Sequence, residues 1–434
     1  MMPLIAILIM VALMMIGVPI AYSFLGSAAF LTFTTNISSG AVMPYGFKQM
    51  DSVVMLTMPL FILAGTIMNE GGLGEKLIDA VNRIVGRITG GLGIVTTVTC
   101  AVFGALSGSS TATVAAIGGI MAPRLEKAGY DKGFIGALIS SSGVLGLLIP
   151  PSMIQILYAW GSGTSVLACF LAIIGPGLLV TTLISVQVYL YAKKKPNLQQ
   201  AAIEAKNAPR VKAVRQKGEH GVLAALIMPV LILGTIYGGI LTPTESAAVS
   251  VAYAIPVGAL WYRKLKKETF KKSLIDSCNV TGQVFMLVLA IGVLSRMFNM
   301  LKVPQQLADV ILGISDNRIV VMLMLNVFMV ILGMFMDDMT GTLLCSTLLV
   351  PVANAVGVSS VQFAGILACN MGMALVTPPC AGLLYVGGKI AKTTVNEMLP
   401  YTLRMIAFVW IPSILLATFI PPLTLFLPTL FGYV

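Results

Sequence analysis

Runs of apolar residues, each about as long as a bilayer is thick, recur along the chain and constrain its fold more than any other feature. Such runs begin near residues 2, 52, 134, 164, 221, 245, 279, 361 and 400, and about 20 apolar residues make one helical crossing. Only 10% of the 434 residues are charged and 57% are hydrophobic, whereas a soluble globular protein is about one quarter charged. The sequence therefore predicts an all-α polytopic membrane protein.

Charge is distributed unevenly along the chain. Segments 192–220 and 263–272 hold 14 of the 27 Lys and Arg residues, and His220 ends the first of them. By the positive-inside rule both segments are expected on the cytoplasmic side, so the net charge of +11 reflects membrane topology and not a nucleic-acid partner. The uncharged stretch 1–47 lacks the basic start of a secretory signal peptide, and we expect it to remain as a membrane helix.

Two further apolar segments, 92–122 and 319–356, are interrupted near their middle by polar residues. The interruptions are "SGSSTAT" at 107–113 and "MDDMTGT" at 336–342. Two short arms around a polar tip predict a re-entrant hairpin, which is tolerated only where the tip is buried in protein or lines a watery cavity. The alternative for the first tip is close helix packing, since Gly, Ser and Thr are common where membrane helices meet.

A Pro-Pro pair inside an apolar run follows each predicted hairpin. Proline costs a helix interior about 3 kcal/mol, so "LLIPPS" at 147–152 and "LVTPPC" at 375–380 predict two broken helices. Ser110 and Asp338 each precede a proline by thirteen residues, and these prolines, Pro123 and Pro351, are expected to close the second hairpin arms. A hairpin followed by a broken helix, occurring twice, is typical of the internal repeats of secondary transporters.

Each break frees backbone carbonyl oxygens and exposes a half-helix N-terminus, which together offer cation ligands and an anion site. Sodium is the expected cation, because hard cations take oxygen ligands. Asp337 and Asp338 lie at the second tip, and a carboxylate inside a membrane segment is a functional hypothesis by default. They could ligate a cation, pair with an arginine or exchange a proton; alternatively, one or both cap the hairpin tip in water.

At these residues the sequence resembles the large membrane subunit of the tripartite ATP-independent periplasmic (TRAP) transporters. The similarity extends along essentially the whole chain. The blocks that carry it are "IGVPIAYSF" (16–24), "MPLFILAGTIMNEGGL" (58–73), "GRITGGLGIV" (86–95), "SGSSTATVAAIG" (107–118), "LEKAGYD" (125–131), "IPPS" (149–152), "LTPTESAAVSVAYA" (241–254) and "LVTPPC" (375–380). The resemblance implies a sodium-coupled importer of organic acids in a bacterial inner membrane. It also implies two partners, a small membrane subunit of about four helices and a periplasmic binding protein that delivers the small carboxylate substrate.

The resemblance further implies two inverted repeats, a scaffold and a mobile transport domain that moves like an elevator. On this chain the scaffold helices and an interfacial arm would be 1–90, and transport-domain repeat 1 would be 91–163. Scaffold helices with the basic loops would occupy 164–318, repeat 2 would be 319–392, and a C-terminal helix would be 393–434.

In this family the sodium sites form between a hairpin tip and the broken helix after it. The residues that the resemblance assigns to sodium, two ions or more, are Ser107, Ser110, Gly146, Ile149 and Pro151 at the first site, and Phe335, Asp337, Asp338, Ala374 and Thr377 at the second. The second tip departs from the first, since "MDDMTG" replaces "SGSSTA". The residues expected next to the substrate are Ser109, Thr111, Asn370, Pro150 and Pro378.

Other polar residues have more ordinary explanations. Thr242, Pro243 and Glu245 in "LTPTE" have the spacing of a helix capping box. Arg296 and Arg404 could each attract a substrate carboxylate, although such residues more often extend to the membrane interface. Residues 75–90 have a helical apolar period that predicts an amphipathic helix, either at the membrane interface or as a solvated connector.

Competing functions fit the sequence less well. An intramembrane aspartyl or serine hydrolase needs converging carboxylates or a nucleophile with a base, but the two aspartates are neighbours and His220 lies in a basic segment. An ion channel lacks a recognisable filter motif, and no Walker sequence indicates ATP drive. The sequence thus favours a secondary importer and not an enzyme. A sugar acid such as sialic acid is the preferred substrate because few buried cations are available for a second carboxylate, and a C4-dicarboxylate is the alternative.

Overall fold

Helices and short turns make up the computed structural model, which describes residues 2–35, 37–200, 223–378 and 381–433. No β-strand occurs in these ranges, so the all-α prediction is confirmed. Most of the basic segment 192–220, including His220, lies outside the described residues, as do Pro379 and Cys380. The helices, with three π-helical segments η1–η3, are α1 (Met2–Met15), α2 (Ile20–Thr34), α3 (Ser39–Met50), α4 (Val53–Glu70), α5 (Leu73–Val85), α6 (Gly91–Ser107), α7 (Ser110–Thr113), η1 (Val114–Gly118), α8 (Gly119–Lys127), α9 (Lys132–Gly143), α10 (Leu145–Leu148), α11 (Met153–Ser162), α12 (Val166–Lys193), α14 (Leu223–Tyr237), α15 (Pro243–Pro256), η2 (Val257–Trp261), α16 (Lys267–Met300), α17 (Val303–Ile314), α18 (Arg318–Phe335), α19 (Asp338–Leu348), α20 (Val350–Ala355), α21 (Ser360–Ala374), α22 (Gly382–Ala391), α23 (Val395–Met405), η3 (Ile406–Trp410), α24 (Ile411–Phe419) and α25 (Pro422–Leu430).

Five helices within the described residues are long and apolar enough to cross a membrane. They are Val53–Glu70, Val166–Lys193, Lys267–Met300, Arg318–Phe335 and Val395–Phe419. A sixth crossing results if the pair Lys132–Leu148 and Met153–Ser162, bent by 45°, counts as one span. The structure therefore agrees with a multi-pass membrane protein.

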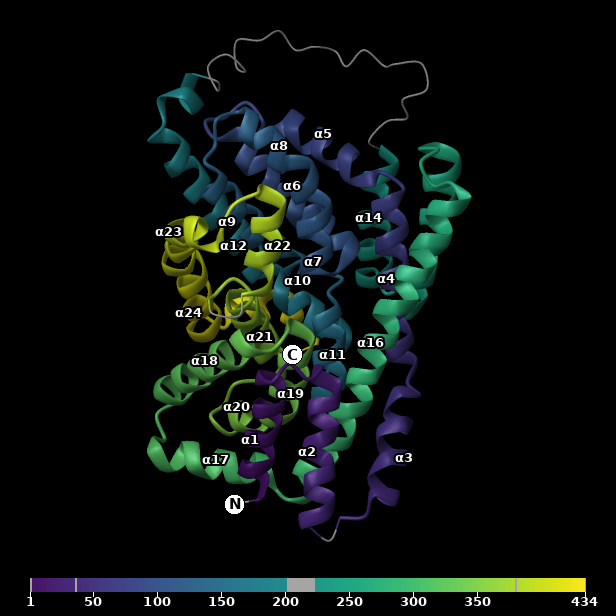
Figure 1. Cartoon of the computed structure of the whole chain (residues 1–434), viewed down its shortest axis with the longest axis vertical. Helices are drawn as coiled ribbons and strands as arrows, with labels where there is room; N and C mark the ends of the chain where they lie inside the picture. The colour runs from purple at the N-terminus through teal and green to yellow at the C-terminus, as the bar shows by residue number, and fades with distance from the viewer. Residues whose placement is uncertain (1, 36, 201–222, 379–380, 434) are drawn as a thin grey trace.

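The centre of the molecule contains α9 and α21, which are buried along almost their whole length. Both are rich in Gly, Ala and Ser, so neighbouring helices can approach them closely. At Gly372 of α21, for example, a Cβ would lie 2.6 Å from the side chain of Val144. Around α9 and α21 pack α6, α12, α18, α22 and α24 (Figure 1).

A second group of helices lies beside this core. Helix α16, 34 residues long, packs along α2, α3 and α4, and α4 also packs on α15. In Figure 1 α16 runs along most of the height of the molecule, with its first residues near α14 and its last near α17. Contacts between the two groups are made by α4 with α6 and α11, by α16 with α19 and by α17 with α20, so the groups meet along a long boundary.

The two prolines expected to close the hairpin arms behave differently. Pro123 lies inside α8, which continues to Lys127, so the expectation was wrong there. The turn before this proline carries Gly119 and follows the wider η1 segment, and such irregular turns accommodate proline within a helix. Pro351 instead lies in the first turn of a new helix, α20, where its missing N–H leaves no hydrogen bond unmade.

The positions at which helices begin and end test three further predictions from the sequence. The capping box is confirmed: Thr242 N–H donates to Glu245 Oε2 at 2.8 Å, and Glu245 N–H donates to Thr242 Oγ1 at 3.3 Å. The helix expected over 75–90 is shorter, because α5 ends at Val85 and Ile88 is 47% exposed. The apolar run from residue 2 is divided into α1 and α2 by Gly17, whose φ is 92°.

Candidate functional site

The first hairpin reverses direction between α6 and α7. Helix α6 ends at Ser107, and Gly108 adopts a left-handed conformation with φ 59°, which only glycine adopts without steric cost. Ser109 is the N-cap of α7 and accepts a hydrogen bond from Ala112 N–H at 3.4 Å. A Cβ at Gly108 would lie 2.9 Å from the Pro151 carbonyl oxygen, so the turn packs directly against the first helix break.

Several oxygen atoms converge at this tip. Ser107 Oγ lies 3.0 Å from Thr113 Oγ1 and 3.3 Å from the Ser109 carbonyl oxygen. Thr113 Oγ1 donates to that same carbonyl at 2.7 Å. Ser107 and Thr113 are both buried, so the tip encloses hydroxyl and carbonyl oxygens away from the surface.

The first predicted helix break is present in the structure. Helix α10 ends at Leu148, Ile149 is extended, and α11 begins at Met153, whose N–H donates to the Gly108 carbonyl at 3.3 Å. Gly146 brings the preceding backbone onto the tip, because a Cβ there would lie 2.6 Å from the Ser109 carbonyl oxygen and 2.8 Å from Thr113 Oγ1. The hairpin and the break therefore form one packed unit.

The second hairpin reverses direction between α18 and α19. Helix α18 ends at Phe335, whose side chain is 48% exposed, so only its backbone can serve a buried site. Asp337 is the N-cap of α19, and its Oδ1 accepts a hydrogen bond from Thr340 Oγ1. Asp338 begins α19, and its Oδ1 accepts a hydrogen bond from Met339 N–H at 3.0 Å. The neighbouring carboxylates thus have different partners.

The second break follows α21, which ends at Ala374. Thr377 Oγ1 donates to the Met373 carbonyl at 2.6 Å, so this hydroxyl lies against the end of the helix. A Cβ at Gly333 of α18 would lie 2.6 Å from the Cβ of Ala374. As in the first unit, a glycine in the hairpin allows the helix before the break to approach closely.

The two hairpin tips meet each other. Ser110 Oγ donates to Asp338 Oδ2 across 3.3 Å, a long hydrogen bond between residues 228 positions apart. The structure therefore brings together the two residues that occupy matching positions in the sequence pattern. It does so beside both helix breaks.

The residues expected next to the substrate differ in how exposed they are. Pro150 is buried in the first break, Pro378 is partly buried in the second, and Ser109 is partly buried at the first tip. Thr111 is exposed on α7. Asn370 is fully buried in α21, where its Nδ2 donates to Asn326 Oδ1 at 2.9 Å and to the Ile366 carbonyl at 2.8 Å.

Three residues at this site were not singled out from the sequence. Thr113 supplies a hydroxyl to the first tip, and its position within "SGSSTAT" was the available signal. Gly104 allows α6 to touch the backbone just before the first break, since a Cβ there would lie 2.6 Å from Gly146 Cα. Gly65 of α4 lies against the tip as well, with a Cβ position 3.2 Å from Ser107 Cα. Such contacts depend on how helices pack and leave no spacing pattern.

The donor atoms at the first tip fit a hard cation. Ser107 Oγ, Thr113 Oγ1 and the Ser109 carbonyl are mutually close, the Pro151 carbonyl faces Gly108, and all are oxygens. Oxygen-only sites suit sodium and similar ions. In the ranges that the structure describes, no cluster of three His, Cys, Asp or Glu side chains could hold a metal ion.

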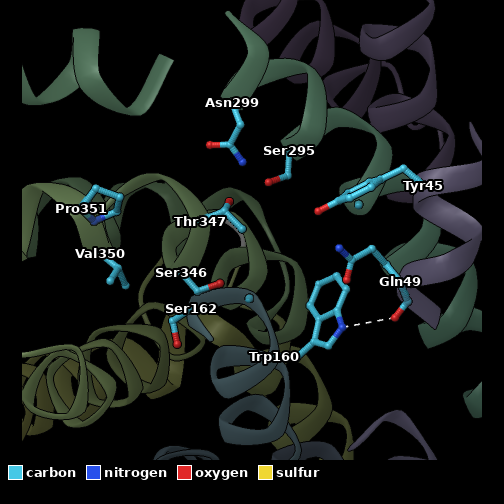
Figure 2. A pocket seen from close by; sticks show the side chains of 12 residues that line it. Tyr45, Gln49, Trp160, Ser162, Ser295, Asn299, Ser346, Thr347, Val350 and Pro351 are labelled. Atoms are coloured by element: carbon cyan, nitrogen blue, oxygen red, sulfur yellow. Dashed lines mark hydrogen bonds between the residues drawn. The ribbon is translucent and has the colours of Figure 1, made fainter. Parts of the chain in front are cut away.

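A polar cavity of about 270 Å³ lies away from the tips, where the two groups of helices meet (Figure 2). One wall comes from α3 and α16, and the other comes from α11, α19 and the start of α20. Polar side chains from both walls point into it, namely those of Tyr45, Gln49, Ser295, Asn299 and Ser346, and Ser162 lines it with its hydroxyl turned away. The Arg296 guanidinium carbon lies 4.8 Å from the centre of the Tyr45 ring.

Comparison with known proteins agrees with the sequence resemblance. Residues 7–423 match the family described as "Tripartite ATP-independent periplasmic transporter, DctM component". The sialic acid TRAP transporter large permease protein SiaM of Vibrio cholerae is 33% identical over 423 residues, which cover 97% of each chain. The C4-dicarboxylate TRAP transporter large permease protein DctM of Pseudomonas aeruginosa is 31% identical, over 89% of this chain and 88% of its own.

Two further similarities concern a fused relative and the fold. The isethionate TRAP transporter permease protein DctMQ of Oleidesulfovibrio alaskensis is 31% identical over 95% of this chain, which spans 64% of that protein's length. The crystal structure of the YdaH transporter of Alcanivorax borkumensis has a similar fold, with a TM-score of 0.60, 14% identity and coverage of 85% and 86% of the two chains. From the family match and these relatives we conclude that the chain belongs to the DctM family, the large permease component of tripartite ATP-independent periplasmic transporters, and is a transporter subunit and not an enzyme.

Proposed function

We propose that this chain is the permease of a sodium-coupled importer of an organic acid, preferably a sugar acid, in a bacterial inner membrane. The observation that carries the proposal is the meeting of the two hairpin tips at Ser110 and Asp338, where α7 packs on α10 before the first break and on α22 after the second. Broken helices in transporters offer carbonyl oxygens for cations and half-helix N-termini for anionic groups. A coupling ion and an acid could therefore bind within one small volume.

We propose a sodium site at each hairpin tip, formed together with the helix break that follows it. At the first tip the ligands would be Ser107 and backbone oxygens near Gly146, Ile149 and Pro151, with Ser110 next to them, and the enclosed hydroxyl and carbonyl oxygens support this assignment. At the second tip they would come from Phe335, Asp337 and Asp338 with Ala374 and Thr377. Asp338 is the stronger ligand candidate of the two carboxylates, because it lies where the two tips meet and accepts the Ser110 hydroxyl, whereas Asp337 is engaged with Thr340 of its own helix.

The substrate is proposed to lie between the tips, against Ser109, Thr111, Pro150, Pro378 and α21 near Asn370. The Asn370 Nδ2 is used by Asn326 and by the Ile366 carbonyl, whereas its buried Oδ1 has no hydrogen-bond partner among the described residues. Relatives named for sialic acid and for C4-dicarboxylates are similarly distant from this chain, so a C4-dicarboxylate is the second candidate.

The proposed orientation of the chain in the membrane rests on the distribution of its Lys and Arg residues. With segments 192–220 and 263–272 in the cytoplasm, the end of α16 at Met300 would face the periplasm. There a periplasmic binding protein would deliver substrate, and a small membrane subunit of about four helices would complete the permease; the name DctMQ of the fused relative supports such a second subunit.

Transport is proposed to follow an elevator mechanism. Repeats 91–163 and 319–392 would carry the site across, and 1–90 and 164–318 would form the scaffold. The long boundary between α16 with its neighbours and the core helices supports this division, because alternating access requires one unit to move against another around the site.

Uptake into proteoliposomes tests the proposal. The chain and its small subunit are reconstituted, binding proteins loaded with labelled sialic acid or succinate are added outside, and the inward gradient is sodium or potassium. We expect uptake of one substrate, only with sodium and only with its binding protein. Uptake that is indifferent to sodium would contradict the ion sites, and uptake without any binding protein would make this an ordinary secondary carrier.

A further inference from the structure

We infer that the polar cavity between α3, α16, α11 and α19 is a second binding site, which takes a hydroxylated monocarboxylate on its way to the hairpin tips. The inference deepens the proposed function and rests on it for the direction of transport. It concerns different residues from those at the tips. The cavity walls come from helices that the proposal assigns to the scaffold and to both transport repeats.

The cavity holds polar groups that the described protein leaves unused. Within the part of the chain that the structure describes, the side chains of Tyr45, Gln49, Ser295 and Asn299 make no hydrogen bond. Two of them come from α3 and two from α16, and Figure 2 shows all four turned toward the same space. Together they offer hydroxyl and amide groups that both donate and accept, which is the chemistry that recognises ligand hydroxyls.

The opposite wall is fixed and supplies acceptors. Ser162 Oγ donates to the Tyr158 carbonyl at 2.7 Å, and Ser346 Oγ donates to the Leu343 carbonyl at 2.9 Å. Because the Ser346 hydroxyl proton is engaged, its oxygen lone pairs remain to accept from a ligand, whereas Ser162 Oγ also bonds to Thr164 Oγ1 at 2.8 Å. Trp160 Nε1 donates to the Gln49 carbonyl at 3.3 Å and joins this wall to α3 (Figure 2).

Charge selects the ligand class. Among the residues that the structure describes, no Lys, Arg, Asp or Glu side chain lines the cavity; Arg296 lies outside the lining, with its guanidinium over the ring of Tyr45, which is a lining residue. One guanidinium can hold one carboxylate bidentately, while a second carboxylate would enter without a charged partner, at a large desolvation cost. The site therefore favours several hydroxyls and a single carboxylate, as in a sugar acid, over a dicarboxylate.

The position of the cavity connects it to the hairpin tips. Ser346 lies eight residues after Asp338 on α19, which is about 12 Å at a helical rise of about 1.5 Å per residue. Likewise α11 begins beside the first break at Met153 and reaches the cavity at Ser162. A ligand held there would lie at the far ends of the two helices whose near ends form the tip site, on the side proposed to face the periplasm.

Equilibrium binding to the complete permease in nanodiscs tests the inference, with labelled sialic acid, gluconate and succinate as probes. The cavity contains no proposed sodium ligand, so we expect a sugar acid to bind in potassium as well as in sodium. The double variant Ser295→Val/Asn299→Leu should weaken the potassium binding about 20-fold, from the loss of two hydrogen bonds. Asn279→Leu is the matched control, because it places the same change on an exposed position of the same helix and should leave binding unchanged.

A second variant separates binding from folding. Arg296→Gln should weaken binding of gluconate but not that of the neutral polyol sorbitol, a difference that a folding defect would not produce. Absence of any sugar-acid binding in potassium, equal binding by the double variant, or succinate binding as tight as gluconate would overturn the inference. Sodium-dependent uptake is measured on the same protein preparations after reconstitution into proteoliposomes: its absence in the unaltered protein refutes the proposed function, while unchanged uptake and binding in the double variant refute only the second site.

Discussion

Ser110 Oγ lies 3.3 Å from Oδ2 of Asp338, although the two residues are 228 positions apart in the sequence. Each residue begins the helix that follows a hairpin turn, α7 in one unit and α19 in the other. A carboxylate that accepts this hydroxyl and the Met339 N–H is held at the N-terminus of α19, where the helix dipole stabilises negative charge. The contact therefore joins the two tips through a charged group.

Replacing Asp338 with Asn should impair sodium coupling. The change keeps the shape of the side chain but removes its charge, and hydrogen bonds to charged groups contribute about 1.5–3 kcal/mol. We expect the sodium concentration for half-maximal uptake to rise about tenfold or more. Sodium titration of uptake in proteoliposomes measures this effect.

The neighbouring carboxylate is the matched control for that experiment. Asp337 is the N-cap residue of α19 but makes no capping hydrogen bond, and its Oδ1 accepts the Thr340 hydroxyl, which the Oδ1 of Asn can also accept. Asp337→Asn should leave the sodium dependence close to that of the unaltered protein. If the two variants shifted it equally, the distinct roles assigned to the two carboxylates would be wrong.

A methyl group at Gly146 should separate the first hairpin from its helix break. The added Cβ would lie 2.6 Å from the Ser109 carbonyl oxygen, and overpacking of this kind costs about 1–3 kcal/mol. Gly146→Ala should lower both the thermal unfolding temperature and the apparent sodium affinity. Gly119→Ala provides the comparison, because nothing lies within 4 Å of its Cβ position and alanine stabilises a helix by about 0.5–1 kcal/mol relative to glycine. A Gly146→Ala protein as stable as the Gly119→Ala protein would contradict the packing described here.

The sequence predicted the helical class and both helix breaks because these follow from local composition. Apolar runs of membrane length and Pro-Pro pairs act on the backbone wherever they occur, and the capping box at Thr242 needs only neighbouring residues. Asn370 differs: its amide is used by Asn326 on another helix, which in turn donates to Thr418 Oγ1 at 3.0 Å. No spacing rule reveals such a partner.

Pro123 and the cavity beside Tyr45 are two further features that local sequence patterns did not reveal. Pro123 was expected to end a hairpin arm but lies within α8, since the irregular turn before it accommodates the ring. The cavity beside Tyr45 was not anticipated either, because its side chains come from α3, α11, α16 and α19 and share no local motif. What the sequence did not reveal is the contact between helices that are distant in the chain.

Asp131 should contribute stability that depends on pH. It lies in the turn before α9 and accepts hydrogen bonds from Tyr191 OH at 2.8 Å, from Tyr401 OH at 2.9 Å and from Lys195. Burial raises the pKa of this carboxyl, but the hydrogen bonds from Lys195, Tyr191 and Tyr401 outweigh that effect and the pKa is lowered overall. The pKa of an aspartate in the unfolded chain is about 3.9. Because the pKa of Asp131 is lower than this in the folded protein, its carboxylate stabilises the fold above the unfolded pKa, and this stability is lost as the pH falls through the folded pKa.

Asp131→Asn tests this pH dependence. Since the side chain is 41% exposed, solvent screening limits the loss to about 1 kcal/mol at neutral pH. The difference in thermal unfolding temperature between the variant and the unaltered protein should be constant from pH 8 to about pH 5 and should shrink below about pH 4. If the difference in unfolding temperature grew as the pH fell, the pKa of Asp131 would be raised in the folded protein and not lowered.

A side chain larger than hydrogen at Gly65 should impair transport, more severely as its size increases. Gly65 of α4 faces the first hairpin tip, with a Cβ position 3.2 Å from Ser107 Cα and 3.5 Å from the Ser107 carbonyl oxygen. If α4 belongs to the scaffold and the tip moves, this contact must slide during each cycle, so alanine should slow uptake several-fold and leucine should abolish it. Gly282→Leu on α16 is the control, because its Cβ position has no neighbour within 4 Å, and its uptake should remain normal. Proteoliposome uptake, together with an unfolding temperature for each variant, measures both effects. Normal uptake by Gly65→Leu would show that α4 and the hairpin tip do not move past each other as the elevator proposal requires.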